Sequence, residues 1–188
     1  MKFAVALGLC AIVAAGGVLA FTSSPSVAAI EQGARAPDFT LNAAKGGQAY
    51  RLNLAQELRK GPVVLYFFPA AFTPGCTVEA NLFAEKSDDF QKLGAQVIGV
   101  TAGNIDRVAE FSKVECRDKF AVAADPGAAV AARYEAAMQI AGKPMMSNRT
   151  SFVIAPDGRI LLRYTDRKPQ GHITQTMAAV QAWKAQQR

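Results

Sequence analysis

The sequence has little histidine and cysteine, the residue types that most often bind zinc or pair in catalytic dyads. Its 188 residues include one histidine, His172, and three cysteines, Cys10, Cys76 and Cys116. It contains no Cys-x-x-Cys pair, the arrangement that dithiol oxidoreductases normally need at a helix start. The sequence therefore has too few of these residues to favour a zinc site built on histidine or a Cys–His dyad. We expect His172 to lie at a helix start or on the surface, far from any acidic cluster.

The chain also lacks a block of charge of one sign. The net charge is +6, but the lysines and arginines are scattered and form no stripe. This distribution favours a solvated basic surface and not a nucleic-acid partner. Half of the residues are hydrophobic and 19% are charged, which is typical of a globular protein. The length suggests one domain with a sizeable core.

Residues 1–29 read as a secretory signal peptide. An unbroken run of apolar and glycine residues over 3–21 follows Lys2, and Ser26-Val27-Ala28 fits a small-residue cleavage site. The alternative is an uncleaved anchor, because the run approaches the roughly 20 residues that span a bilayer. We expect membrane contact only in that case. Either way, residues 30–188 form an extracytoplasmic domain that retains two cysteines, which could form a plain structural disulfide.

The rest of the sequence predicts an α/β fold. Apolar runs predict strands over 63–68, 96–101, 120–124, 151–155 and 159–164. Helical patterns cover 54–60, 77–93, 105–115, 128–137 and 173–184. The first strands imply right-handed parallel crossovers, and the turn at 156–158 implies a closing hairpin. We therefore expect a central mixed β-sheet flanked by helices on both faces, the plan of the thioredoxin-like folds.

Cys76 is the most informative residue, since it lies between a strand and a helix. Thr73 suits the N-cap, Pro74 suits the first helical position, and Gly75 allows a ligand to approach the backbone. Free N–H groups and the positive end of the dipole favour a thiolate here and could also bind an anionic oxygen. The alternative is that 73–75 merely turn the chain and Cys76 is a small buried hydrophobe.

Residues 69–76, Pro-Ala-Ala-Phe-Thr-Pro-Gly-Cys, resemble the Pro-x-x-x-Thr-x-x-Cys motif of the peroxiredoxins. The wider run from Phe67 to Ala80 is similar to the Q-type branch, also called bacterioferritin comigratory proteins. The resemblance extends from about Gly33 to the end of the chain. It covers the whole expected domain, and the order of strands and helices agrees with it independently.

The resemblance implies a peroxidase that uses no metal, haem or other cofactor. Cys76 matches the peroxidatic cysteine, whose thiolate attacks a peroxide oxygen and becomes a sulfenic acid. Thr73 matches the hydroxyl that hydrogen-bonds the peroxide and the sulfur, and Pro69 matches the residue that shields the pocket from water. Arg149 matches the family's arginine, which would stabilise the thiolate and polarise the peroxide. Glu79 matches the residue that orients this arginine. Without the motif, Arg149 reads as a solvated charge at a strand entry and Glu79 as an ordinary acid near a helix start.

The sequence departs from the commonest Q-type pattern at Asn81. Many members carry the resolving cysteine at this position, five residues after the first. Some peroxiredoxins place it on the helix that corresponds to 105–115, and Cys116 follows that helix here. We therefore expect Cys116 to attack the sulfenic acid and form an intramolecular disulfide, which requires local unwinding if the two residues lie far apart. The alternative is a one-cysteine enzyme recycled by an outside thiol.

The resemblance also indicates the partners. Hydrogen peroxide and organic hydroperoxides are the expected substrates, and a thioredoxin-like protein or another thiol is the expected reductant. Q-type relatives are often monomers, so we expect a monomer or weak dimer. Two other functions stay open: a thiol–disulfide oxidoreductase, which fits poorly, and a redox-sensing or binding domain with a static bridge between Cys76 and Cys116.

Overall fold

The computed structural model describes residues 30–187. The signal peptide that the sequence predicts over 1–29 lies outside these residues. Within the described part of the chain, none of the helices combines the length and the apolar character needed to cross a membrane.

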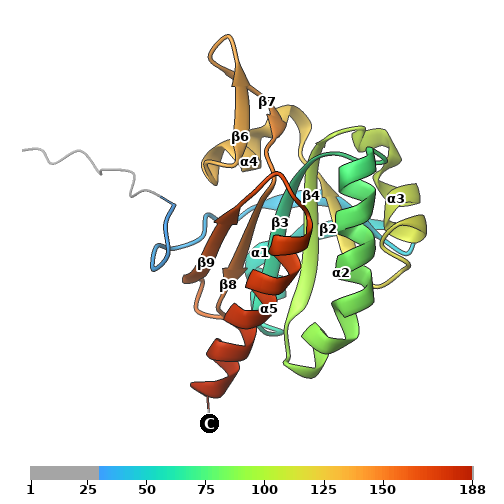
Figure 1. Ribbon diagram of the computed structural model, residues 1–188. Coiled ribbons are helices and arrows are strands. Elements are labelled where there is room, and N and C mark those ends of the chain that lie inside the picture. Colours follow the sequence, from blue (N-terminus) through green and yellow to red (C-terminus); the bar gives the residue numbers. More distant parts are fainter. Residues whose placement is uncertain (1–29, 188) are drawn as a thin grey trace, which may run out of the picture.

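A seven-stranded mixed sheet forms the centre of the molecule, in the order β2-β1-β5-β4-β3-β8-β9 (Figure 1). The three middle strands β5, β4 and β3 are parallel, and the strands on both sides pair in antiparallel fashion. The strands are β1 (Thr40–Lys45), β2 (Gln48–Asn53), β3 (Val63–Ala70), β4 (Gln96–Gly103), β5 (Ala121–Ala124), β8 (Thr150–Ile154) and β9 (Ile160–Thr165).

Helices cover both faces of this sheet. On one face lie α2 (Pro74–Lys92), α3 (Val108–Val114) with the preceding 3-10 turn η1 (Ile105–Arg107), and α5 (Gln170–Ala185), which packs beside α2 (Figure 1). On the other face lie α1 (Leu54–Leu58) and α4 (Ala129–Arg133), which follows the turn η2 (Pro126–Ala128). The parallel strands all end at the same edge of the sheet, where α2 begins.

Strand β3 lies at the centre of the core and contributes to both layers. Successive side chains of a strand point to opposite faces, so a strand covered on both sides is apolar throughout. One face of β3 packs against α1 and α4, and the other packs against α2, α3 and α5. The two sets are Val63, Leu65 and Phe67, and Val64, Tyr66 and Phe68. Each of these large side chains stabilises the fold by about 1.5–3 kcal/mol through burial.

The predicted mixed sheet with helices on both faces is confirmed, but one predicted helix is wrong over half its length. The Ala-rich segment 128–137 is helical only in α4, which ends at Arg133. Tyr134 is buried there and donates a hydrogen bond to the carbonyl of Pro37, and Glu135 has a left-handed φ of 51°. The chain then turns into an unpredicted hairpin of β6 (Ala137–Ile140) and β7 (Lys143–Ser147), which projects from the molecule (Figure 1). Strands β1 and β2 are also absent from the strands that the sequence predicts.

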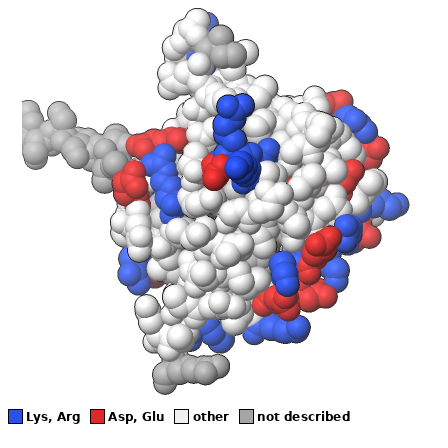
Figure 2. Space-filling view, in the orientation of Figure 1, with Lys and Arg blue, Asp and Glu red and all other residues white. Residues whose placement is uncertain are grey.

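Charged side chains of both signs are interspersed on the face shown in Figure 2. Two of the ion pairs in the described structure join α2 to the segment that follows α3. Lys119 Nζ lies 2.9 Å from Asp88 Oδ1, and Arg117 Nη2 lies 3.5 Å from Glu85 Oε1. These exposed pairs are individually weak, at about 0–1 kcal/mol each.

Candidate active site

Helix α2 begins directly after β3 and places Cys76 in its first turn. Thr73 is the N-cap by its extended backbone, with φ −87° and ψ 148°, and Pro74 occupies the first helical position. The Thr73 hydroxyl does not cap the helix; it donates to the carbonyl of Ala70 at 3.1 Å. The N–H groups of Gly75 and Cys76 therefore have no partner within the helix.

Arg149 lies just before β8 and reaches across to α2. Its Nη2 lies 3.5 Å from Cys76 Sγ, its Nη1 donates to Glu79 Oε2, and its Nε donates to the carbonyl of Arg167 at 3.1 Å. The side chain of Arg149 is only 9% exposed. Gly75 makes this approach possible, because a Cβ there would lie 3.2 Å from Arg149 Nη2. The guanidinium is thus fixed at three points, one of which is the sulfur.

Glu79 is completely buried behind the arginine. Burial raises the pKa of Glu79 to about 8, although Arg149 acts in the opposite direction. Burial lowers the pKa of Arg149, but Glu79 and Cys76 outweigh it, so the net shift is upward. Both forms of the Glu79 carboxyl can accept the N–H of Arg149. In its neutral form, Glu79 does not neutralise the charge of the guanidinium that faces Cys76 Sγ.

His172 lies at a helix start, one of the two positions expected for it. It occupies the first turn of α5 and is buried, and its Nδ1 is 3.8 Å from Glu79 Oε1. Its Nε2 lies 2.9 Å from the carbonyl of Asp166, which requires an N–H on Nε2. Nδ1 then accepts from the hydroxyl of Ser151 at 2.8 Å. Burial lowers the pKa of His172, in keeping with a neutral ring. The sequence pattern carried no signal for this contact.

Cys116 lies beyond the end of α3, and its backbone N–H donates to the carbonyl of Phe111. Both Cys76 and Cys116 are buried and free. Among residues 30–187, the buried hydroxyl of Tyr66 has no hydrogen-bond partner. Tyr66 belongs to the same buried cluster as Cys76 and Cys116. Burial raises the pKa of Tyr66 well above its usual value, and Cys116, Glu79 and Cys76 raise it further.

The structure brings Cys76, Arg149 and Glu79 into contact, and Thr73 belongs to the same turn. Pro69 is half-buried near the end of β3, and its carbonyl accepts from the Thr101 hydroxyl. Cys116 lies on the segment after α3, in the same buried cluster as Cys76, and no contact with Arg149 or Glu79 is recorded for it among the described residues. Within residues 30–187, no three His, Cys, Asp or Glu side chains gather as a metal site would require.

A cysteine at a helix start beneath a buried arginine, on a sheet of this order, is the arrangement of a thioredoxin-like thiol enzyme. Solved structures agree. Peroxidoxin BcpB from Mycobacterium tuberculosis matches with a TM-score of 0.71 and 32% identity, over 81% of this chain and 97% of that one. Mycobacterium tuberculosis AhpC, at 18% identity and a TM-score of 0.69 over 82% and 93% of the two chains, shares the fold.

Sequence comparisons lead to the family itself. The model of the AhpC/TSA family matches residues 32–163. Chloroplastic peroxiredoxin Q from Populus jackii is 31% identical over 170 residues, 87% of this chain and 76% of the relative. Chloroplastic peroxiredoxin Q from Oryza sativa subsp. japonica is 30% identical over 154 residues, 81% of this chain and 68% of the relative. The chain belongs to the AhpC/TSA family, and the expected thiol-dependent peroxidase with a thioredoxin-like fold is confirmed.

Proposed function

We propose that Cys76 is the peroxidatic cysteine and reduces hydrogen peroxide and organic hydroperoxides. The observation that carries the proposal is the 3.5 Å approach of Arg149 Nη2 to Cys76 Sγ at the start of α2. The thiolate attacks the terminal peroxide oxygen and the O–O bond breaks. The sulfur loses two electrons and becomes a sulfenic acid, and the leaving oxygen takes a proton to give water or an alcohol. Arg149 stabilises both the thiolate and the developing charge on the leaving oxygen.

Thr73 and Pro69 complete the proposed pocket. The Thr73 hydroxyl donates to Ala70, so its oxygen still has a lone pair free to accept from the O–H of a peroxide. Pro69 is half-buried and offers no N–H, so it is suited to exclude water from the sulfur. Glu79 positions Arg149 through its buried hydrogen bond. These assignments follow the motif, and the geometry of the first turn is compatible with each.

Cys116 is the proposed resolving cysteine. Its thiolate attacks the sulfenic sulfur of Cys76, the S–O bond breaks, and the hydroxide that leaves takes a proton to become water. A thioredoxin-like protein or another small thiol then reduces the disulfide. The alternative is a one-cysteine cycle in which an outside thiol attacks the sulfenic acid of Cys76 directly.

Single cysteine variants test this assignment. Cys76→Ser should lose peroxidase activity by at least about a thousandfold, because no other described residue shares its setting. Cys116→Ser should retain the first step with hydrogen peroxide but stop at the sulfenic acid. Intact-mass analysis after one equivalent of peroxide should show loss of two hydrogens in the wild type and gain of one oxygen in Cys116→Ser. Full activity in Cys76→Ser would refute the proposal, and a persistent sulfenic acid in the wild type would favour the one-cysteine cycle.

An extracytoplasmic location and a role in antioxidant defence are part of the same proposal. The location rests on the apolar run over 3–21 and the small residues that follow it. N-terminal sequencing of the mature protein from cell fractions tests it. Cleavage near Ala28 with recovery outside the cytoplasm is the expected result, and a full-length cytoplasmic chain would contradict it.

A further inference from the structure

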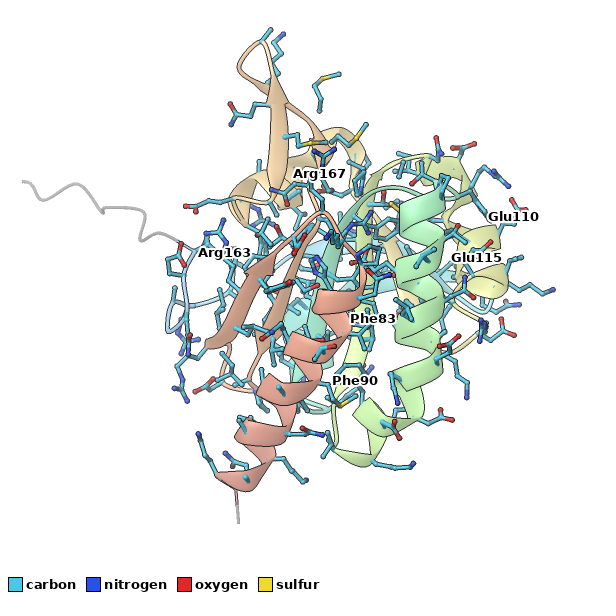
Figure 3. The ribbon with its side chains drawn as sticks, in the orientation of Figure 1. Phe83, Phe90, Glu110, Glu115, Arg163 and Arg167 are labelled. Atoms are coloured by element: carbon cyan, nitrogen blue, oxygen red, sulfur yellow. The ribbon has the colours of Figure 1, made fainter. Side chains whose placement is uncertain are left out.

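The segment that carries Cys116 is held against α2 by Asn81. The amide Nδ2 of Asn81 donates to Glu115 Oε2 at 2.8 Å and to the carbonyl of Thr77 at 2.8 Å. Its Oδ1 accepts from Arg117, whose Nη2 and Nε lie at 2.6 and 3.1 Å. One side chain therefore binds the residues on both sides of Cys116. Figure 3 shows Glu115 beside α2, on the side where α3 runs.

The backbone after Cys116 is strained in this docked arrangement. Arg117 and Asp118 are consecutive non-glycine residues with left-handed φ values of 50° and 59°. Such a conformation is unfavourable for L-residues and persists only where surrounding contacts hold it. Backbone hydrogen bonds close this turn, from Asp118 N–H to the Ser112 carbonyl at 3.3 Å and from Lys119 N–H to the Cys116 carbonyl at 2.9 Å. The side-chain contacts to α2 add to these bonds and hold the closed turn against the helix.

Cys116 is inert while the turn is closed. The residue is fully buried among apolar side chains that include Phe111 and Phe120. Burial, and then the nearby Glu115, raise the pKa of the Cys116 thiol well above its usual value. A protonated, enclosed thiol attacks a sulfenic acid poorly. The segment must therefore leave the core before Cys116 can reach Cys76.

We propose that Asn81 is a positioning residue that latches the Cys116 segment onto α2, and that opening of this latch sets the rate of disulfide formation. The proposal rests on Cys116 being the resolving cysteine. The position that carries the resolving cysteine in many Q-type sequences then has a different task here, which is to hold the distant one in place. While the latch stays closed, the Cys76 sulfenic acid persists, and a second peroxide can oxidise it to the sulfinic acid.

A time course of oxidation by hydrogen peroxide, quenched by alkylation, tests the latch in the full domain. The wild type, Asn81→Ala and Glu115→Ala are mixed with one equivalent of hydrogen peroxide, alkylated at intervals and analysed by intact mass. Both variants should convert sulfenic acid to disulfide about tenfold faster or more, because Glu115→Ala removes one and Asn81→Ala removes three of the hydrogen bonds between Asn81 and the segment. The rate of Cys76 oxidation should not change. Excess peroxide should yield less sulfinic acid than in the wild type.

Matched controls separate the latch from charge and from general destabilisation. Glu115→Gln removes the same charge as Glu115→Ala but keeps an acceptor for Asn81, so the difference between the two measures the hydrogen bond. Asp89→Ala breaks pairs to Lys86 and Lys92 within α2 and should leave disulfide formation unchanged. Hydrogen exchange should quicken over 114–119 in Asn81→Ala and not in β3 or β8.

Two outcomes would overturn the latch in distinguishable ways. If the disulfide formed in Asn81→Ala and Glu115→Ala at the same rate as in the wild type, the latch would be refuted and Cys116 would remain the resolving cysteine. Failure of the wild type to form any intramolecular disulfide would refute the resolving role of Cys116, and the latch with it.

Discussion

At the residue scale, Arg149 connects Cys76 with Glu79. It contacts the sulfur of Cys76 and the carboxyl of Glu79 from one nearly buried guanidinium. A lysine could supply the charge but not the two separate N–H directions, because its ammonium is a point charge on a flexible stem. We therefore expect the arginine to matter for geometry as well as for charge.

Replacement of Arg149 should show both requirements. We expect Arg149→Gln to lower the second-order rate constant of Cys76 oxidation by about a hundredfold or more, comparable to the loss of one electrostatic donor in other enzymes. Arg149→Lys should recover only part of this loss. The measurement is rapid-mixing kinetics with hydrogen peroxide. Arg163→Gln, which removes an arginine paired with Glu31 and Glu135 outside the site, serves as the control. Equal rates in Arg149→Gln and Arg163→Gln would exclude the assigned role.

The sequence carried enough signal to select most of these residues but not their contacts. Cys76, Thr73 and Pro74 are neighbours along the chain, so helix-start chemistry alone groups them. Arg149 is distant in sequence, and only the family resemblance pointed to it. The burial of His172 beside Glu79 depends on how α5 packs against α2, which no local pattern encodes.

At the element scale, the start of α2 allows the resolving cysteine to be moved. Asn81 lies one and a half turns after Cys76 on the same helix, so a thiol there reaches Cys76 only if the first turns unwind. We expect Asn81→Cys in a Cys116→Ser background to form an intramolecular disulfide after peroxide treatment. Intact mass and peptide mapping would detect it. Cys116→Ser alone is the control and should form none. A stable sulfenic acid in the double variant would show that α2 stays wound.

The elements that were predicted well are those with a strong, uninterrupted pattern. Strand β3 and helix α2 have long apolar or amphipathic runs, and α2 merely begins three residues earlier than expected because Pro74 fits its first position. Strands β6 and β7 are short and projecting, and no apolar alternation marks them. The Ala-rich sequence before them favours a helix, and the tertiary contact of Tyr134 with Pro37 ends that helix.

At the scale of the whole molecule, the buried Glu79 links stability to pH. Its pKa is raised to about 8 in the fold, whereas an unfolded glutamate titrates near about 4.3. Between these values the folded state retains a proton that the unfolded state has lost. The free energy of unfolding therefore falls as pH rises through this window, by up to about 1.4 kcal/mol per pH unit.

Glu79→Gln should remove this dependence. A glutamine at this position keeps an oxygen that accepts from Arg149 but does not titrate. We expect the wild type to lose stability relative to Glu79→Gln as pH rises from about 5 to 8. Urea unfolding of the reduced proteins at several pH values measures the difference. Glu110→Gln, at an exposed glutamate paired with Arg107, is the matched control and should follow the wild type. If the free energies of unfolding of the wild type and Glu79→Gln changed in parallel with pH, the prediction would be wrong. Arg149 would then hold Glu79 ionised throughout this range, and the two residues would form an ion pair beside Cys76.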